Sequence, residues 1–88
     1  MDTSNEVSLS VIQSMVEEIV RLVVEDPTQV RVVSIRQNNS VVTLEIEVAP
    51  SDRGRVVGQK GLVINSLRTI ARIVGAQRGL RVKIDLVE

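Results

Sequence analysis

The sequence predicts one α+β domain with the element order α-β-β-α-α-β, built as a three-stranded mixed sheet with three helices on one face. Helices are indicated in residues 10–24 and 62–75, where apolar residues recur at intervals of three or four. Strands are indicated in residues 41–48 and 80–86, where apolar and polar residues alternate. A length of 88 residues allows one packed core and excludes a second domain.

The first helix is expected to begin near Ser8 or Ser10 and to run for about four turns. Because its apolar residues are mostly β-branched, packing must stabilise this helix more than intrinsic propensity does. The helix should end at Asp26-Pro27, since a proline biases the preceding residue away from helical dihedral angles. The stripe expected to face the core comprises Ile12, Met15, Val16, Ile19, Val20 and Val23.

Residues 30–48 are predicted to form an antiparallel hairpin. Val30–Arg36 is rich in β-branched residues, and Val41–Val48 alternates between apolar and polar positions. Between them, Asn38 and Asn39 tolerate positive φ and suit a tight turn. The face of the second strand expected to be buried carries Val42, Leu44, Ile46 and Val48.

Two helices and a strand are predicted in the second half. Pro50 suits the first turn of a short helix that runs to about Val57, and Asp52 is expected to face its positive end. The next helix begins at Leu62 and should end at Gly75 as a C-cap. Its expected core positions are Ile64, Leu67, Ile70, Ala71 and Val74. The last strand is expected over Leu80–Leu86, with alternate residues buried.

The composition disfavours an enzyme. The chain contains no Cys and no His, so thiolate zinc sites, Cys nucleophiles and the usual general base are missing. We therefore assign no metal, cofactor or catalytic residue. The exposed pair Glu45 and Glu47 is interpreted as a solubility device or an edge guard. A nucleotide-hydrolysing phosphate loop is rejected, because Gly61 occupies the position of its hydroxyl residue.

No membrane segment is predicted. The apolar stretch Val11–Val24 is interrupted by three charged residues and is too short to cross a bilayer. The polar start Met1–Asn5 does not resemble a signal peptide, and the absence of Cys suits a reducing compartment. We expect a cytoplasmic protein with a flexible N-terminus at residues 1–6 and the domain at residues 7–88.

The net charge of zero conceals a strong asymmetry. Residues 1–50 contain eight acidic and three basic side chains, whereas residues 51–88 contain three acidic and eight basic ones. From Arg53 to Ile84 there are eight Arg or Lys and no Asp or Glu. Such a stretch indicates either a surface for a polyanion or a solvated basic face, and the charge pattern alone favours neither. Because the chain has no Phe, Tyr or Trp, it cannot stack bases on aromatic rings.

The segment that carries most information about function is the loop Gly58-Gln59-Lys60-Gly61, between two predicted helices. Two glycines at this spacing remove the Cβ atoms that would hold a sugar-phosphate chain away, and they permit a very tight reversal. The following helix presents unpaired N–H groups to an anion, and Lys60 adds a mobile cation. Beside the loop, Gly54 and Val57 leave room for a narrow apolar groove that suits flat bases.

The run Val56-Val57-Gly58-Gln59-Lys60-Gly61 resembles the Val-Ile-Gly-x-x-Gly signature of KH domains. The predicted element order is similar to the bacterial type II KH arrangement. Residues 7–87 as a whole resemble the KhpA-like family of small single-domain RNA-binding proteins. The lead-in Ala49-Pro50-Ser51-Asp52 also resembles that family, whereas Val57 replaces the commoner Ile of the signature. This loss of one methylene should change the depth of the groove slightly.

The resemblance implies a type II KH fold that clamps about four nucleotides of single-stranded RNA. The residues that it implies hold backbone phosphates are Gly58, Gln59, Lys60 and Gly61. Those that it implies border the base groove are Gly54, Val57, Leu62 and Ile64. Electrostatic support is implied for Arg55 and Arg68.

The same resemblance implies partners and roles. The implied partner is a second copy of the chain, in a homodimer, or a larger protein with its own KH domain, in a heterodimer. The implied role is that of an RNA chaperone or post-transcriptional regulator linked to cell division and elongation. The alternative is a protein-interaction module on a KH scaffold with little RNA affinity of its own. A net charge of zero and a pI near 6.3 keep this alternative open.

Overall fold

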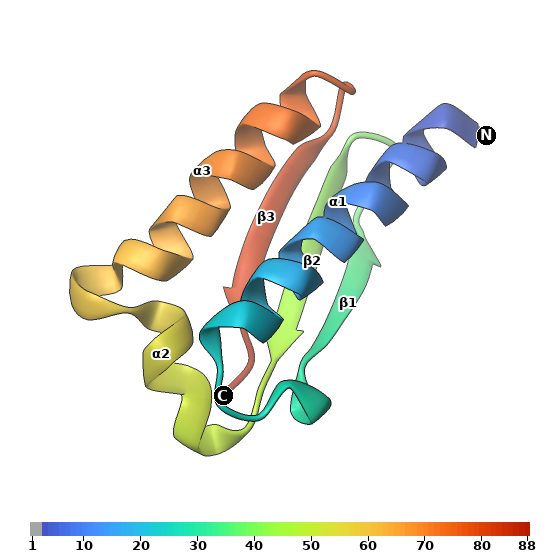
Figure 1. The fold of residues 1–88 in the computed structure, drawn as a ribbon. Coiled ribbons are helices and arrows are strands. Elements are labelled where there is room, and N and C mark those ends of the chain that lie inside the picture. The colour runs from blue at the N-terminus through green and yellow to red at the C-terminus, as the bar shows by residue number, and fades with distance from the viewer. Residues whose placement is uncertain (1–2) are drawn as a thin grey trace.

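The computed structural model describes the backbone of residues 3–88 and the side chains from residue 6 onward. The predicted order α-β-β-α-α-β is confirmed (Figure 1). The helices and strands are α1 (Thr3–Val23), β1 (Arg31–Arg36), β2 (Val41–Glu47), α2 (Arg53–Val57), α3 (Leu62–Ala76) and β3 (Arg81–Leu86). Single 3₁₀ turns at Pro27–Gln29, Pro50–Asp52 and Gln59–Gly61 connect them.

Helix α1 begins at Thr3, earlier than the start predicted at Ser8 or Ser10. The apolar stripe extends one turn further than expected, because Leu9 is also buried, and packing of such a stripe stabilises a helix more than a capping residue does. Within α1, Gln13 donates its Nε2 to the carbonyl of Val32 in β1 at 2.7 Å. The flexibility of residues 1–6 stays a prediction, and residues 1 and 2 lie outside the described residues.

The three strands form one mixed sheet in the order β1-β2-β3. Strands β1 and β2 are antiparallel, with Val32 opposite Ile46, as the predicted hairpin requires. Strands β2 and β3 are parallel, with Leu44 opposite Ile84. A parallel pair needs a long crossover, and α2 and α3 provide it. Strand β3 lies at one edge of the sheet and packs against α3, the helix that follows the glycine loop.

The helices α1 and α3 cover one face of the sheet, and α2 lies at the end of this helical layer (Figure 1). The core forms between the two layers, and the alternation predicted for β2 is confirmed. The largest fully buried apolar side chains of the core are Ile12, Val16, Val20, Val42, Leu44, Ile46, Val56 and Ile84. Ile70 departs from the prediction, because its side chain is 41% exposed.

Gly75 is not the C-cap of α3, since the helix continues to Ala76. A Cβ atom on Gly75 would lie 2.8 Å from the carbonyl oxygen of Leu80 and 2.8 Å from a methyl carbon of Val82. Glycine is thus required here for the close approach of α3 to β3. The left-handed residue that follows the helix is Gly79, with φ of 70°.

Candidate nucleic-acid interface

The loop Gly58–Gly61 reverses the chain between α2 and α3. Gly58 has φ 77° and ψ 171°, a combination that is essentially restricted to glycine. Lys60 and Gly61 both adopt left-handed conformations, with φ of 56° and 74°. Two internal hydrogen bonds close the turn, from Gly58 N–H to the Gly54 carbonyl at 2.9 Å and from Gly61 N–H to the Gly58 carbonyl at 3.1 Å. The loop is therefore a defined structure before any ligand arrives.

Both glycines also lie against the first turns of α3. A Cβ atom on Gly58 would lie 2.6 Å from a methyl carbon of Val63 and 2.8 Å from its backbone nitrogen. A Cβ atom on Gly61 would lie 2.9 Å from Nδ2 of Asn65. The glycines thus serve two purposes, because they permit the dihedral angles of the reversal and they let α2 and α3 meet closely.

The middle of the loop is open to solvent. Gln59 and Lys60 are exposed, and among the described side chains Lys60 takes part in no ion pair. The side chain of Lys60 is thus free to contact an incoming anion. Gly58 and Gly61 are half-buried, because Val63 and Asn65 lie against them, so the exposed part of the loop is Gln59 and Lys60.

A groove lies beside the loop, between the corner formed by α2 and α3 and the C-terminal end of β3. Val57 and Ile64 form part of its wall, as predicted for two residues that border bases. Val57 is 39% exposed, so it offers an apolar surface to a ligand. The remaining lining residues are Glu45, Arg68, Asp85, Leu86, Val87 and Glu88.

Arg68 crosses from α3 to the edge of the sheet. Its Nε donates to the carbonyl of Ile84 in β3 at 3.1 Å, and its Nη1 donates to Oδ1 of Asn65 at 3.2 Å. These two bonds hold the guanidinium group at the groove, and Arg68 lines both this groove and its continuation along β3. Sequence reasoning placed Arg68 near the site but could not identify the carbonyl that holds it.

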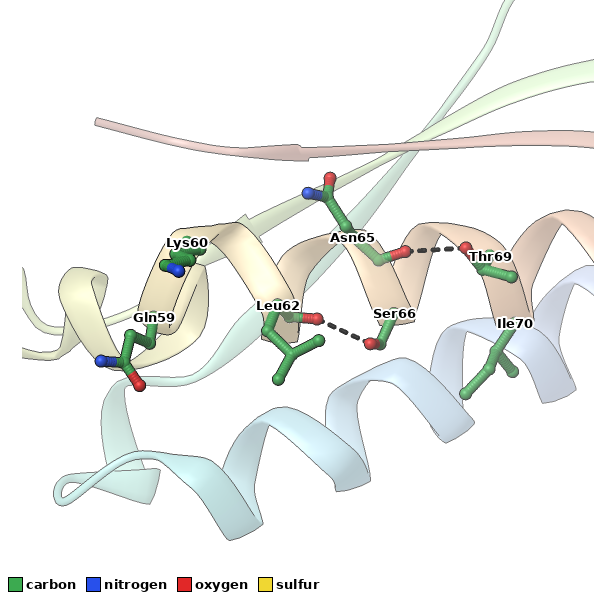
Figure 2. A pocket seen from close by; sticks show the side chains of 7 residues that line it. All are labelled: Gln59, Lys60, Leu62, Asn65, Ser66, Thr69 and Ile70. Carbon is green, nitrogen blue, oxygen red and sulfur yellow. Dashed lines mark hydrogen bonds between the residues drawn. The ribbon is translucent and has the colours of Figure 1, made fainter.

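Three other predicted residues lie differently. Leu62 is 68% exposed but does not line the groove of Val57 and Ile64, because it is two positions from Ile64 on a helix and points away from it. It lines a second groove, together with the loop residues Gln59 and Lys60. Figure 2 shows Leu62 projecting on one side of α3 and Asn65 on the other. Gly54 presents open space, since a Cβ atom there would meet no atom within 4 Å. Arg55 is not a free cation, because it pairs with Glu25 and with Asp52.

Asp52 is a residue whose role the sequence did not reveal. We expected its side chain to face the positive end of α2. The side chain makes no capping hydrogen bond to α2 and is almost completely buried, at 1% exposure. Oδ1 accepts the N–H of Glu25 at 3.0 Å and Oδ2 accepts the N–H of Asp26 at 3.1 Å. Asp52 thereby ties the start of α2 to the end of α1. These partners are 26 and 27 residues away in the chain, so no local pattern could indicate them.

In the part of the chain that the structure describes, no group of three or more Asp, Glu, His or Cys side chains is placed to hold a metal ion. Within the same residues, no helix combines the length and the apolar character needed to cross a membrane.

The element order, the mixed sheet and the glycine loop between α2 and α3 define a type II KH domain. The model of the family described as KhpA/KhpB, KH domain, matches residues 13–86. The chain belongs to the KhpA/KhpB KH-domain family.

Curated relatives agree with this assignment. The chain is similar to the RNA-binding protein KhpA of Aquifex aeolicus, with 32% identity over 91% of this chain and 100% of the relative. It is 36% identical to the KhpA protein of Streptomyces coelicolor over 88% of this chain and 92% of the relative. The KhpA protein of Clostridium acetobutylicum is 28% identical, over 85% of this chain and 99% of the relative. The family is non-catalytic.

Proposed function

We propose that this protein binds single-stranded RNA, with the loop Gly58–Gly61 against the sugar-phosphate backbone and bases in the groove beside it. The observation that carries the proposal is the reversal Gly58–Gly61, which places Gln59 and Lys60 in solvent between two half-buried glycines. The apolar wall of Val57 and Ile64 suits the faces of bases, which the chain cannot stack on aromatic rings. The names of the relatives, which are RNA-binding proteins, support the same function.

The physiological role that fits this proposal is that of an RNA chaperone or post-transcriptional regulator in the cytoplasm, linked to cell division and elongation. A single domain that contacts about four nucleotides binds weakly, and its affinity falls as salt rises. Useful affinity therefore requires two domains acting together.

The partner that would supply the second domain is another copy of this chain or a larger KH-containing protein. The pairing of two names in the description of the family supports a heteromeric partner. The proposed interaction surface is one side of α3, because the apolar residues Leu62, Ile70 and Ile73 are 68%, 41% and 56% exposed there. Figure 2 shows Leu62 and Ile70 on this side with Ser66 between them, away from Asn65.

Charge reversal in the loop tests the proposal. The double variant Gln59→Asp with Lys60→Asp should nearly abolish binding of a short single-stranded RNA, measured by fluorescence anisotropy, because two carboxylates repel phosphate. The thermal midpoint should stay close to that of the wild type. Both side chains are exposed, and Asp is one of the residues that tolerate the left-handed conformation found at Lys60.

The matched control is Arg31→Asp with Gln37→Asp, which makes the same change in net charge at exposed positions on and beside β1. This control should retain most of the affinity for RNA. If the folded loop variant binds RNA as tightly as the control does, the loop is not the RNA site. The alternative function, a protein-interaction module, would then be favoured.

A further inference from the structure

The groove beside the glycine loop does not end at Arg68. A second hollow continues from it along the outer edge of β3 toward the start of that strand, and the two share Arg68 and Asp85. The residues that line this continuation are Arg68, Arg72, Arg81, Val82, Lys83, Ile84 and Asp85. We call the surface formed by Arg72, Arg81 and Lys83 the β3 track.

The regular geometry of α3 and β3 brings these cations together. Arg68 and Arg72 are four residues apart, so they occupy the same side of α3. Arg81 and Lys83 are two residues apart in β3, so they point to the same face of the strand. Val82 and Ile84, which alternate with them, are buried in the core, so Arg81 and Lys83 point to the sheet face away from α3. The hollow joins them to Arg68 and Arg72 across the open edge of β3.

The charge of this surface changes along its length. The groove next to the loop contains the carboxylates of Glu45, Asp85 and Glu88. The hollow that contains the β3 track shares only Asp85 with that set, and its other charged residues are basic. Arg72, Arg81 and Lys83 are exposed, and none of them forms an ion pair with any side chain in residues 6–88. The track therefore carries uncompensated positive charge, which an anionic polymer complements.

On the basis of the proposed function, we propose that the RNA strand extends past the nucleotides held at the glycine loop into the β3 track. There Arg72, Arg81 and Lys83 contact the phosphates of additional nucleotides. The footprint is then longer than the roughly four nucleotides that a KH loop and groove cover. Arg68, held by Ile84 and Asn65, marks the junction between the two segments.

The test compares RNA length with the positions of the cations. Anisotropy titrations use oligouridylates of about four and about ten nucleotides, the shorter one matching a single KH footprint. The wild type should bind the longer RNA more tightly. The variant Arg72→Ala with Arg81→Ala should lose most of this gain in affinity while it binds the shorter RNA nearly as the wild type does.

The dependence of affinity on salt gives an independent measure. Each phosphate contact with a single strand contributes about 0.7 to the slope of log K against log salt concentration. Removal of two contacts should therefore lower the slope for the longer RNA by about 1.4 and leave the slope for the shorter RNA unchanged. The control Arg21→Ala with Arg31→Ala makes the same change in net charge at exposed positions outside the track and should change neither slope.

The outcomes separate this inference from the proposed function. The β3 track is not an extension of the site if the Arg72 and Arg81 variant keeps the full gain in affinity with RNA length. The same conclusion follows if the variant loses as much affinity for the shorter RNA as for the longer one. The loop can still bind RNA in either case. Loss of binding in the Gln59 and Lys60 variant together with an unchanged length effect in the Arg72 and Arg81 variant would overturn the track alone.

Discussion

At the scale of single residues, the glycines near the loop have opposite structural requirements. Gly58 combines a glycine-specific backbone conformation with direct contact to Val63. Gly54 lies in the short helix α2 and faces open space. The same substitution at the two positions therefore separates a requirement of the fold from a requirement of the ligand.

Gly58→Ala should lower the free energy of unfolding by about 1–3 kcal/mol, the cost of a strained backbone, and the thermal midpoint by about 4–8 °C per kcal/mol. Gly54→Ala should instead raise stability by up to about 1 kcal/mol, since Ala favours helix over Gly. If Gly54 borders the RNA, this more stable variant should also bind RNA more weakly. Thermal unfolding and anisotropy together check both effects, and unchanged RNA affinity in Gly54→Ala would remove Gly54 from the site.

At the scale of elements, tertiary contacts, above all those of the Asp52 carboxylate, hold α2 in position, because the helix is too short to be stable by itself. Helix α2 contains only five residues, too few to be stable alone. Val56 anchors it in the core, and Asp52 bonds its start to the backbone after α1. The exposed pair between Arg55 and Glu25 joins the same two elements. The glycine loop directly follows α2, so these contacts also hold the loop in place.

Asp52→Ala should lower the free energy of unfolding by about 1–3 kcal/mol, because it removes a buried carboxylate that accepts two partly buried N–H groups. Glu25→Ala, which removes only the exposed partner of Arg55, should cost about 1 kcal/mol or less. Chemical denaturation measures both, and hydrogen exchange should show faster opening of α2 in Asp52→Ala. Equal effects of the two substitutions would contradict the anchoring role of Asp52.

At the scale of the whole molecule, charge is segregated while the net charge is zero. The chain lacks His, the residue whose ordinary pKa lies near neutrality. RNA affinity at constant salt should therefore change little between about pH 6 and pH 8. Anisotropy across this range checks the expectation, and a marked loss of affinity within it would require a titrating group that this interface does not contain.

Asp26 makes stability depend on pH in the acid range. Hydrogen bonds from the side chains of Thr28 and Gln29 hold the pKa of Asp26 below its ordinary value of 3.8. The stabilising contribution of this carboxylate is present above the ordinary pKa and is lost as the pH falls through the lower value of the folded state. The bonds join neighbours in one exposed turn, so their effect is confined to the connection between α1 and β1.

Periodicity in the sequence was sufficient to predict the elements and their order. The strict alternation in β2 and the helical spacing in α3 reflect burial against one neighbouring layer, and both patterns are local. The start of α1 was predicted too late, since the helix begins at Thr3 and the buried Leu9 adds one turn to the apolar stripe. Gly75 was assigned to the helix end, since sequence alone does not distinguish a glycine that stops a helix from one that permits close packing.

By itself the sequence determined the α+β order, the glycine loop and the basic second half, because each depends on residues that are neighbours in the chain. Only the tertiary structure decided which side chains share a groove. It placed Arg68 against the carbonyl of Ile84 and bonded Asp52 to the backbone that follows α1. These contacts join residues that are distant in the chain, so they follow from the packing of α3 on β3 and of α2 on α1.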